Sequence, residues 1–342
     1  MDSEGGRRKM IHALALTGPT ASGKTALSIA LAREIGCEII SADSMQIYRG
    51  MDIGTAKATA EERASIPHHL IDIVSPCDSY STEEYRRDAM AAARSISLKG
   101  KTPLFVGGTG LYIDTLMRAE VKDVPGGDEA LREELLAFAE KNGAHALWER
   151  LLSVDEESAY AIHENNVKRV IRALEIYELT GKPKSHFDRL SRELSADISV
   201  GMITLDFHDR DNLYRRVDTR VEKMLDEGLL YEVKCLYEMG ALDGNSTASQ
   251  AIGYKEFIGY LRGMESLEAA VESLKLASRH YAKRQLTWFR RKTSAARLFV
   301  DTEDGIMKDL DELLSEALLI SGELLKKTDT INKNMDIQNE NK

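Results

Sequence analysis

The first 120 residues alternate between short apolar runs and longer amphipathic stretches. Four apolar runs have the length of buried strands: 12–17, 37–41, 69–74 and 102–106. Between them, residues 24–35 and 82–98 place apolar side chains at helical spacing. Strands that alternate with helices of this length are typical of βαβ units, so the pattern predicts a parallel sheet flanked by helices.

The pattern changes after the sequence Val-Pro-Gly-Gly at 124–127. Residues 128–181 have apolar side chains at helical spacing throughout, which predicts an all-helical insertion. An apolar run at 200–207 then predicts a strand that rejoins the sheet. Further helices are expected at 212–239, 246–262 and 267–291, followed by a last strand at 297–301.

These patterns predict an α/β fold in two parts, followed by a tail. The sheet and the C-terminal helices are expected to occupy 10–121 and 198–325, and the helical insertion 122–197. The polar segment 326–342, rich in Asn and Lys, is expected to be disordered. The length agrees, because roughly 100–200 residues make one domain and the chain has 342.

Composition restricts the environment and the partners. No stretch approaches a membrane-spanning length of apolar residues, and the N-terminus lacks the apolar segment of a signal peptide. Cys37, Cys77 and Cys235 lie far apart, which argues against a zinc site or a disulfide framework and for a reducing, cytoplasmic location. Lys and Arg total 46 against 56 Asp and Glu, and a net charge of −10 taken alone argues against a nucleic-acid partner.

A phosphate-binding loop is predicted between the first strand and the first helix. The sequence there, GPTASGKT, matches the pattern G-x-x-x-x-G-K-[ST] in the strand-to-helix context that this pattern requires. Its members are Gly18, Pro19, Thr20, Ala21, Ser22, Gly23, Lys24 and Thr25. Backbone N–H groups would surround a phosphate, Lys24 would add a positive charge, and the Thr25 hydroxyl can bind Mg²⁺. The sheet is therefore predicted to be of the P-loop type, although the motif does not identify the phosphate compound.

A carboxylate follows the second predicted strand. A hydrolysing P-loop enzyme needs a further apolar strand that ends in Asp, but the strand at 102–106 ends in Gly-Gly-Thr. Asp72 and Asp206 are interpreted as strand-end caps. Asp43 lies at the edge where open α/β sheets bind their ligands. It is a candidate general base or ligand of a metal-bound water, and a turn aspartate is the alternative.

Six segments together resemble the bacterial tRNA dimethylallyltransferase family, also called tRNA isopentenyltransferases. They are GPTASGKT, SADSMQIYRGMDIGTAK at 41–57, VGGTGLY at 106–112, NVKRVIRALE at 166–175, AIGYKE at 251–256 and KRQLTWFR at 283–290. The resemblance covers about residues 14–292, with the motifs in order. The C-terminal zinc finger of the eukaryotic members is absent. Plant adenylate isopentenyltransferases share the phosphate loop and a SADS-like segment, and remain an alternative.

The resemblance implies transfer of a dimethylallyl group from dimethylallyl diphosphate to N6 of adenosine 37 in tRNA, with release of diphosphate. This adenosine is 3′ of the anticodon in tRNAs that read codons starting with U. The implied cofactor is Mg²⁺, and the implied partners are the tRNA anticodon stem-loop and the isoprenoid diphosphate, bound by a monomer. A P-loop that holds this diphosphate need not activate water, which accounts for the missing acidic strand.

The resemblance also implies roles for individual residues. Asp43 would accept the N6 proton, and the Thr109 hydroxyl would help to orient the amine or the diphosphate. Arg216 and Arg220 are four residues apart on one face of the helix expected at 212–226, which without the resemblance is typical of a solvated face. With it, Arg216 would be a catalytic residue that stabilises the departing diphosphate, and Arg220 would bind the diphosphate.

A larger set is implied to contact tRNA, whose adenosine must leave its stack to be modified. This set comprises Asp43, Ser44, Met45, Gln46, Arg132, Lys168, Arg169, Val170, Ile171, Arg172, Gln250, Gly253, Tyr254, Lys255, Lys283 and Arg284. Arg132 matches its family position only after a shift of one residue.

Basic and aromatic residues are mixed late in the chain, with no acid between Arg279 and Val300. This mixture suits RNA loops, in which bases stack and phosphates need neutralising. The alternative is that Trp288 and Phe289 belong to the core. Two other functions also stay open: a P-loop kinase of a nucleotide or small metabolite, and a noncatalytic, ATPase-like RNA-binding protein.

Overall fold

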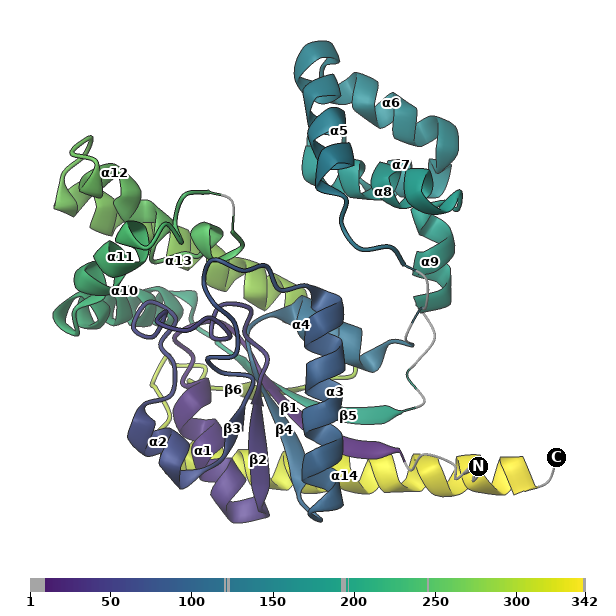
Figure 1. The fold of residues 1–342 in the computed structure, drawn as a ribbon. Coiled ribbons are helices and arrows are strands. Elements are labelled where there is room, and N and C mark those ends of the chain that lie inside the picture. The colour runs from purple at the N-terminus through teal and green to yellow at the C-terminus, as the bar shows by residue number, and fades with distance from the viewer. Residues whose placement is uncertain are drawn as a thin grey trace, which may run out of the picture. The chain divides into compact units, whose positions relative to one another are not determined.

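The protein, described here from a computed structural model, divides into two compact units (Figure 1). The structure describes residues 10–119, 121, 124–191, 195, 197–244 and 246–340. The larger unit is Met1–Met117 with Asp197–Lys342, and the smaller is Arg118–Ala196, whereas the insertion was expected at 122–197. No helix in these described ranges is long and apolar enough to cross a membrane.

The larger unit is built on a six-stranded sheet in the order β3-β2-β4-β1-β5-β6. The strands are β1 (Ile11–Thr17), β2 (Cys37–Ser41), β3 (His68–His69), β4 (Thr102–Gly107), β5 (Ile198–Asp206) and β6 (Ala296–Phe299). Every neighbouring pair is parallel. Thr17 pairs with Gly107, and Ser41 pairs with Val106, so the loops after β1, β2 and β4 leave the sheet side by side. The predicted α/β fold is confirmed.

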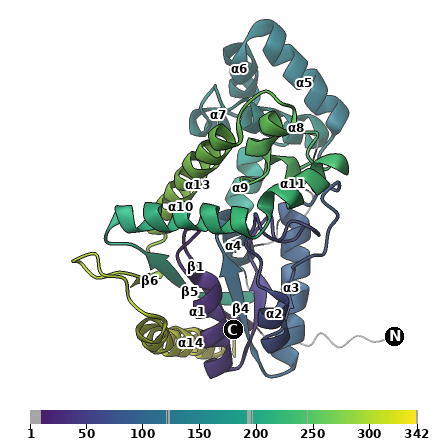
Figure 2. The same ribbon diagram turned by 90° about the vertical axis from the view of Figure 1, so that its left-hand side faces the viewer.

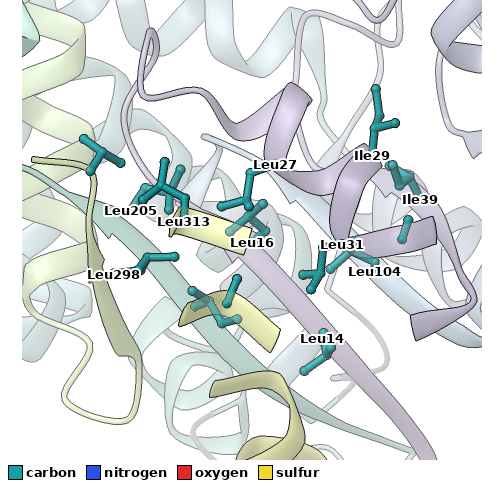
Figure 3. Packing of buried hydrophobic residues seen from close by; sticks show 14 of the residues in the cluster. Leu14, Leu16, Leu27, Ile29, Leu31, Ile39, Leu104, Leu205, Leu298 and Leu313 are labelled. Carbon is teal, nitrogen blue, oxygen red and sulfur yellow. The ribbon is translucent and has the colours of Figure 1, made fainter. Parts of the chain in front are cut away.

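Helices cover both faces of the sheet because β1 alternates its side chains between two apolar clusters. Leu14 and Leu16 point to the face covered by α1 (Lys24–Ile35) and α14 (Leu310–Glu340) (Figure 3). Ala13 and Ala15 join the opposite cluster, which contains residues of α3 (Thr82–Leu98) and α4 (Gly110–Met117). A buried parallel strand needs apolar residues on both faces, which explains the continuous run in its sequence.

Further helices lie beyond the carboxyl edge of the sheet (Figure 2). A third cluster of apolar side chains packs among them. The helices are α10 (Arg210–Asp226), α11 (Leu229–Glu238), α12 (Ile258–Leu261) and α13 (Leu267–Arg290), with 3₁₀ turns at Ala248–Gln250 and Lys255–Phe257. Ile47, Tyr48 and Met51 enter the same cluster from the segment after β2. That segment is therefore packed firmly beside the helices.

From Glu129 to Ser191 the smaller unit consists of helices joined by short connections, and it has its own core. Its helices are α5 (Glu129–Asn142), α6 (Ala144–Val154), α7 (Glu156–Ala161), α8 (Val167–Thr180) and α9 (Lys184–Ser191). Leu135, Leu147, Leu151 and Leu174 are almost fully buried among them. The amphipathic spacing in 128–181 thus corresponds to the four packed helices α5 to α8. The helix α9 lies beyond this range and was not predicted.

Three predicted elements differ from the structure. The strand expected at 69–74 is only His68–His69, because Leu70 and Asp72 have φ values of 60° and 59° and leave the extended conformation. The helix expected at 212–239 is divided by Gly228, whose φ is 101°. The stretch 246–262 forms short 3₁₀ and helical turns.

The end of the chain also differs. The segment from 326 was expected to be disordered, but α14 continues as a helix to Glu340. No Pro or Gly follows Gly322, so nothing in the local sequence interrupts the helix that the buried residues Leu313 and Ala317 begin. Residues 341–342 lie outside the described part.

Candidate active site

The loop between β1 and α1 has a backbone that requires glycine. Gly18 and Gly23 have φ values of 139° and 92°. A Cβ on Gly18 would lie 2.8 Å from the Leu205 carbonyl oxygen. No side chain caps the start of α1 in the described structure. The open N–H groups of the first helical turn are therefore available to an anion.

Lys24 points back over this loop. Its Nζ donates to the carbonyl oxygens of Gly18 at 3.0 Å and Pro19 at 2.6 Å. Burial, and after it the Arg220 charge, lower the pKa of Lys24 to about 7 even though the nearby Asp43 charge opposes both effects. An ammonium group that is desolvated in this way gains most from an anion placed beside it.

Asp43 follows β2 and is held by its own turn, since Oδ1 accepts from the Met45 N–H at 2.9 Å. The Thr109 hydroxyl supports the same segment: it accepts from the Ser44 N–H at 3.0 Å and lies 3.3 Å from the Ser44 hydroxyl. The Thr109 N–H donates to Ala42 at 3.1 Å. Thr109 therefore holds the Asp43 segment from behind and does not line the cavity.

The two arginines of α10 take different positions. The exposed Arg216 donates from Nε to the Ala21 carbonyl at 2.7 Å and so contacts the phosphate loop. Arg220 lines the cavity, where burial lowers its pKa and Asp43 raises it. Both arginines lie near the expected anion, and Arg220 is the one that faces the cavity.

A cavity of about 570 Å³ joins these groups. The phosphate loop and Asp43 form part of its wall. Cationic side chains also line it, from Lys24, Arg220, Lys255 and Arg284. Another part is apolar, from Val217, Val221, Met224, Ile252 and Leu274. The cavity can thus hold an anion and an apolar group beside a carboxylate that can accept a proton.

Comparison with known proteins identifies the family. The model for IPP transferase matches residues 46–292, and the model for isopentenyl transferase matches residues 11–72. The chain belongs to the IPP transferase family. The family resemblance predicted from the motifs is confirmed.

Named relatives of this IPP transferase agree with one another. The tRNA dimethylallyltransferase of Geobacillus thermodenitrificans is 51% identical over 277 residues, or 80% of this chain and 86% of the relative. That of Bacillus velezensis is 50% identical over 81% of this chain and 87% of its own. The crystal structure of a tRNA isopentenylpyrophosphate transferase from Bacillus halodurans has a TM-score of 0.69 and 42% identity, covering 95% of this chain and 100% of that one. The structure of a eukaryotic dimethylallyltransferase acting on tRNA has a TM-score of 0.72 and 32% sequence identity. The match covers 84% of this chain and 74% of that one.

Most of the tRNA-contacting residues expected in the larger unit of this IPP transferase lie at the cavity. The lining includes Asp43, Ser44, Met45, Gln46, Gln250, Gly253, Lys255 and Arg284. Lys283 is exposed on α13. The Gln46 amide, expected to contact a base edge, instead donates to the Thr55 carbonyl at 3.2 Å and accepts from Ser41 at 3.1 Å. Its polar atoms therefore already hold the cavity wall.

Tyr254 is a correction to that list, because its side chain is fully buried. Its hydroxyl donates to Glu232 at 2.7 Å. The same carboxylate accepts from the N–H groups of Asp52, Ile53 and Gly54. Tyr254 and Glu232 therefore fix the segment that becomes the cavity wall at Gly54 and do not face a ligand. Sequence reasoning missed Glu232, which lies outside every motif.

In the smaller unit, the residues expected to contact tRNA divide into three kinds. Val170 and Ile171 are buried in the core of the unit, which corrects the expectation for their side chains. Arg132 and Arg172 both pair with the fully buried Glu175, at 2.7 Å and 2.5 Å. Lys168 and Arg169 are exposed. Among the basic residues expected to contact tRNA in the described part of this unit, Arg132 and Arg172 are ion-paired with Glu175, whereas Lys168 and Arg169 face solvent.

The basic stretch of α13 is neutralised in part by acids from elsewhere in the chain. Arg279 pairs with Asp218, Arg290 with Asp206, and Lys292 with Asp114. Phe289 is buried, as the core alternative proposed, whereas Trp288 is 38% exposed. Asp206 is thus committed to an ion pair, and Asp72 pairs with Lys57 and Arg63. Neither of these carboxylates lines the cavity.

Proposed function

We propose that this protein transfers a dimethylallyl group from dimethylallyl diphosphate to N6 of adenosine 37 in tRNAs that read codons starting with U. The observation that carries the proposal is that Asp43 shares one cavity with the phosphate loop and with an apolar wall. A diphosphate, a five-carbon apolar group and an exocyclic amine need these three surfaces. The names of the relatives support the same reaction.

In the proposed reaction the bond between N6 and the first carbon of the allyl group forms, and the bond from that carbon to the diphosphate oxygen breaks. The Asp43 carboxylate takes the N6 proton, because the amine is a poor nucleophile while its lone pair is delocalised into the ring. The departing diphosphate carries away the electron pair. Lys24 and Arg220 at the cavity, with Arg216 at the loop, offset its charge.

The residues at the loop fit Mg²⁺. The described residues contain no group of three or more His, Cys, Asp or Glu side chains that could form a complete metal cage. Mg²⁺ does not need one, since it is usually held by one or two protein oxygens together with substrate phosphates and waters. The Thr25 hydroxyl and Asp43 both line the cavity and supply such oxygens. When bound there, Mg²⁺ would neutralise charge on the diphosphate.

The proposal includes the setting in which the enzyme works. Its partners would be the tRNA anticodon stem-loop and dimethylallyl diphosphate, and it would act as a monomer in the cytoplasm. Cys37, Cys77 and Cys235 are free, which agrees with a reducing compartment.

One assay tests the proposed function against its alternatives. Purified protein is incubated with Mg²⁺, labelled dimethylallyl diphosphate and either unmodified tRNA or AMP, and in parallel with labelled ATP and small acceptors. Label in tRNA, located at adenosine 37 by nuclease digestion, is the expected result. Label in AMP alone would indicate an adenylate isopentenyltransferase. Transfer from ATP without any label in tRNA would indicate a kinase.

A further inference from the structure

Gln285 connects two loops that the reaction must hold together. It lies on α13, is only 5% exposed, and turns away from the solvent that its neighbours Lys283 and Arg284 face. Its Oε1 accepts from the N–H of Thr20 in the phosphate loop at 2.8 Å. Its Nε2 donates to the carbonyl of Gly108, after β4, at 3.1 Å. One amide group therefore joins the loop after β1 to the loop after β4.

The fit around this amide is close. A Cβ on Gly108 would lie 2.0 Å from Gln285 Nε2, so the contact exists only because residue 108 has no side chain. The two bonds also require different chemistry at the two ends, an acceptor toward Thr20 and a donor toward Gly108. A primary amide supplies both, whereas a carboxylate or a thioether of the same length does not.

The loop after β4 also determines where the base is held. Thr109, next to Gly108, supports the Asp43 segment through Ser44. Tyr281, one helical turn before Gln285, lines the cavity and lies within hydrogen-bonding reach of Thr109 and Gln285. Gln285 thus connects the phosphate loop to the loop after β4, whose Thr109 supports the Asp43 segment.

We propose that Gln285 is a positioning residue that sets the distance between the bound diphosphate and Asp43. The inference rests on the proposed function and deepens it. Gln285 contributes to the cavity lining beside Tyr281, but its amide oxygen and nitrogen each bond to a backbone group of a loop. In this scheme it touches no reacting atom. Its loss should leave anion binding by Lys24 and the helix N-terminus in place. The allyl carbon, the amine and Asp43 would no longer be aligned.

Gln285→Met tests this, because it keeps the length of the side chain and removes both bonds. We expect kcat for tRNA prenylation to fall about 100-fold, the size of loss that a misplacement of about 1 Å can cause. We expect the Kd for inorganic diphosphate, measured by calorimetry in Mg²⁺, to change by less than about threefold, since the groups that bind it remain. A kcat within about threefold of the wild-type value overturns the assignment, as does a loss that appears only in diphosphate affinity.

Gln285→Glu gives a second readout that a purely structural role would not move. A carboxylate can accept from Thr20 but cannot donate to Gly108, whereas a protonated carboxyl can do both. The ratio of variant to wild-type kcat should therefore rise as the pH falls. A ratio that does not change with pH overturns the assignment.

Thr287→Ala is the matched control on the exposed side of the same helix, where the hydroxyl bonds only to the Lys283 carbonyl in the described structure. It should leave kcat and diphosphate affinity unchanged, and thermal melting of all three variants checks that they are folded. Failure of the wild-type protein to modify tRNA would reject the proposed function itself. The diphosphate measurement does not depend on that result.

Discussion

Asp43 can be neutralised with little change to the geometry around it. Asp43→Asn keeps an oxygen that accepts from the Met45 N–H, so the turn is expected to survive. Since the amide cannot take the N6 proton, kcat should fall by about 10²–10⁴-fold, the usual contribution of a general base. Single-turnover kinetics measure the loss, and filter binding measures tRNA affinity, which should be retained. A parallel loss of tRNA affinity would mean that Asp43 has a structural role instead.

Lys24 predicts that diphosphate binding takes up a proton. With a pKa of about 7 in the free protein, Lys24 is largely neutral at pH 8. A bound anion raises that pKa, so the amine is protonated in the complex. At pH 6 it is protonated in both states. We therefore expect an uptake of nearly one proton at pH 8 and almost none at pH 6.

Calorimetry in buffers of different ionisation enthalpy measures this uptake. Diphosphate itself titrates in the same range, so the quantity compared is the difference between wild type and Lys24→Met. Equal uptake by the two proteins at pH 8 would contradict the prediction.

At the scale of the element, the basic residues of α8 have two different roles that its sequence does not distinguish: one forms an ion pair with a buried acid, and the others are exposed to solvent. Arg172 pairs with the buried Glu175 and also donates to the Pro125 carbonyl at 2.8 Å. Removing it leaves a buried carboxylate with one partner fewer, which costs about 1–3 kcal/mol. Lys168 is exposed, and its removal should change stability by no more than about 0.5 kcal/mol.

Arg172→Ala and Lys168→Ala form a matched pair that tests this difference. We expect Arg172→Ala to lower the midpoint of unfolding and to speed amide exchange along α8. We expect Lys168→Ala to weaken tRNA binding at unchanged stability. The reverse pattern would show that Arg172 contacts tRNA directly and that Glu175 does not depend on it.

The sequence predicted those elements whose pattern is local. α1 and α3 have the bounds 24–35 and 82–98 that spacing alone indicated, and five of the strands were placed nearly in full. It failed where tertiary contacts decide. Residues 70–74 are apolar enough for a strand, but Asp72 forms ion pairs with Lys57 and Arg63. Both partners lie outside the apolar run from which the strand was predicted.

The candidate site follows the same division. The phosphate loop and Asp43 lie in contiguous motifs and were found, and both line the cavity. Glu232 and Gln285 act through backbone groups more than 170 residues away in sequence, as the separations of 179 and 265 show. No spacing rule reaches that far. For the same reason, the acids that neutralise α13 were not foreseen, because a charge pattern along one helix does not show its partners.

At the scale of the whole molecule, the net charge of −10 says little about where RNA can bind. Exposed charges act over about one Debye length, near 8 Å in cells, so the local sign decides. In addition to the ion-paired cations of the larger unit, Lys255 and Arg284 line the cavity, and Lys283 is the exposed neighbour of Arg284 on α13. We therefore expect tRNA binding to depend on these few residues.

Because the exposed cations near the cavity would neutralise phosphates, we expect tRNA binding to depend on salt concentration. Despite the acidic total, log affinity should fall linearly with log salt, because each neutralised phosphate releases counterions. Lys283→Ala combined with Arg284→Ala should lower the slope by about 1 for each phosphate that is no longer neutralised. Arg87→Ala is the control, since it removes an exposed cation that is already paired with Asp88 on α3. Fluorescence anisotropy with an anticodon stem-loop at salt concentrations from about 50 to about 300 mM measures the slopes. A flat dependence, or an equal effect of the control, would reject this surface as the docking site, because a side chain that does not neutralise phosphate releases no counterion.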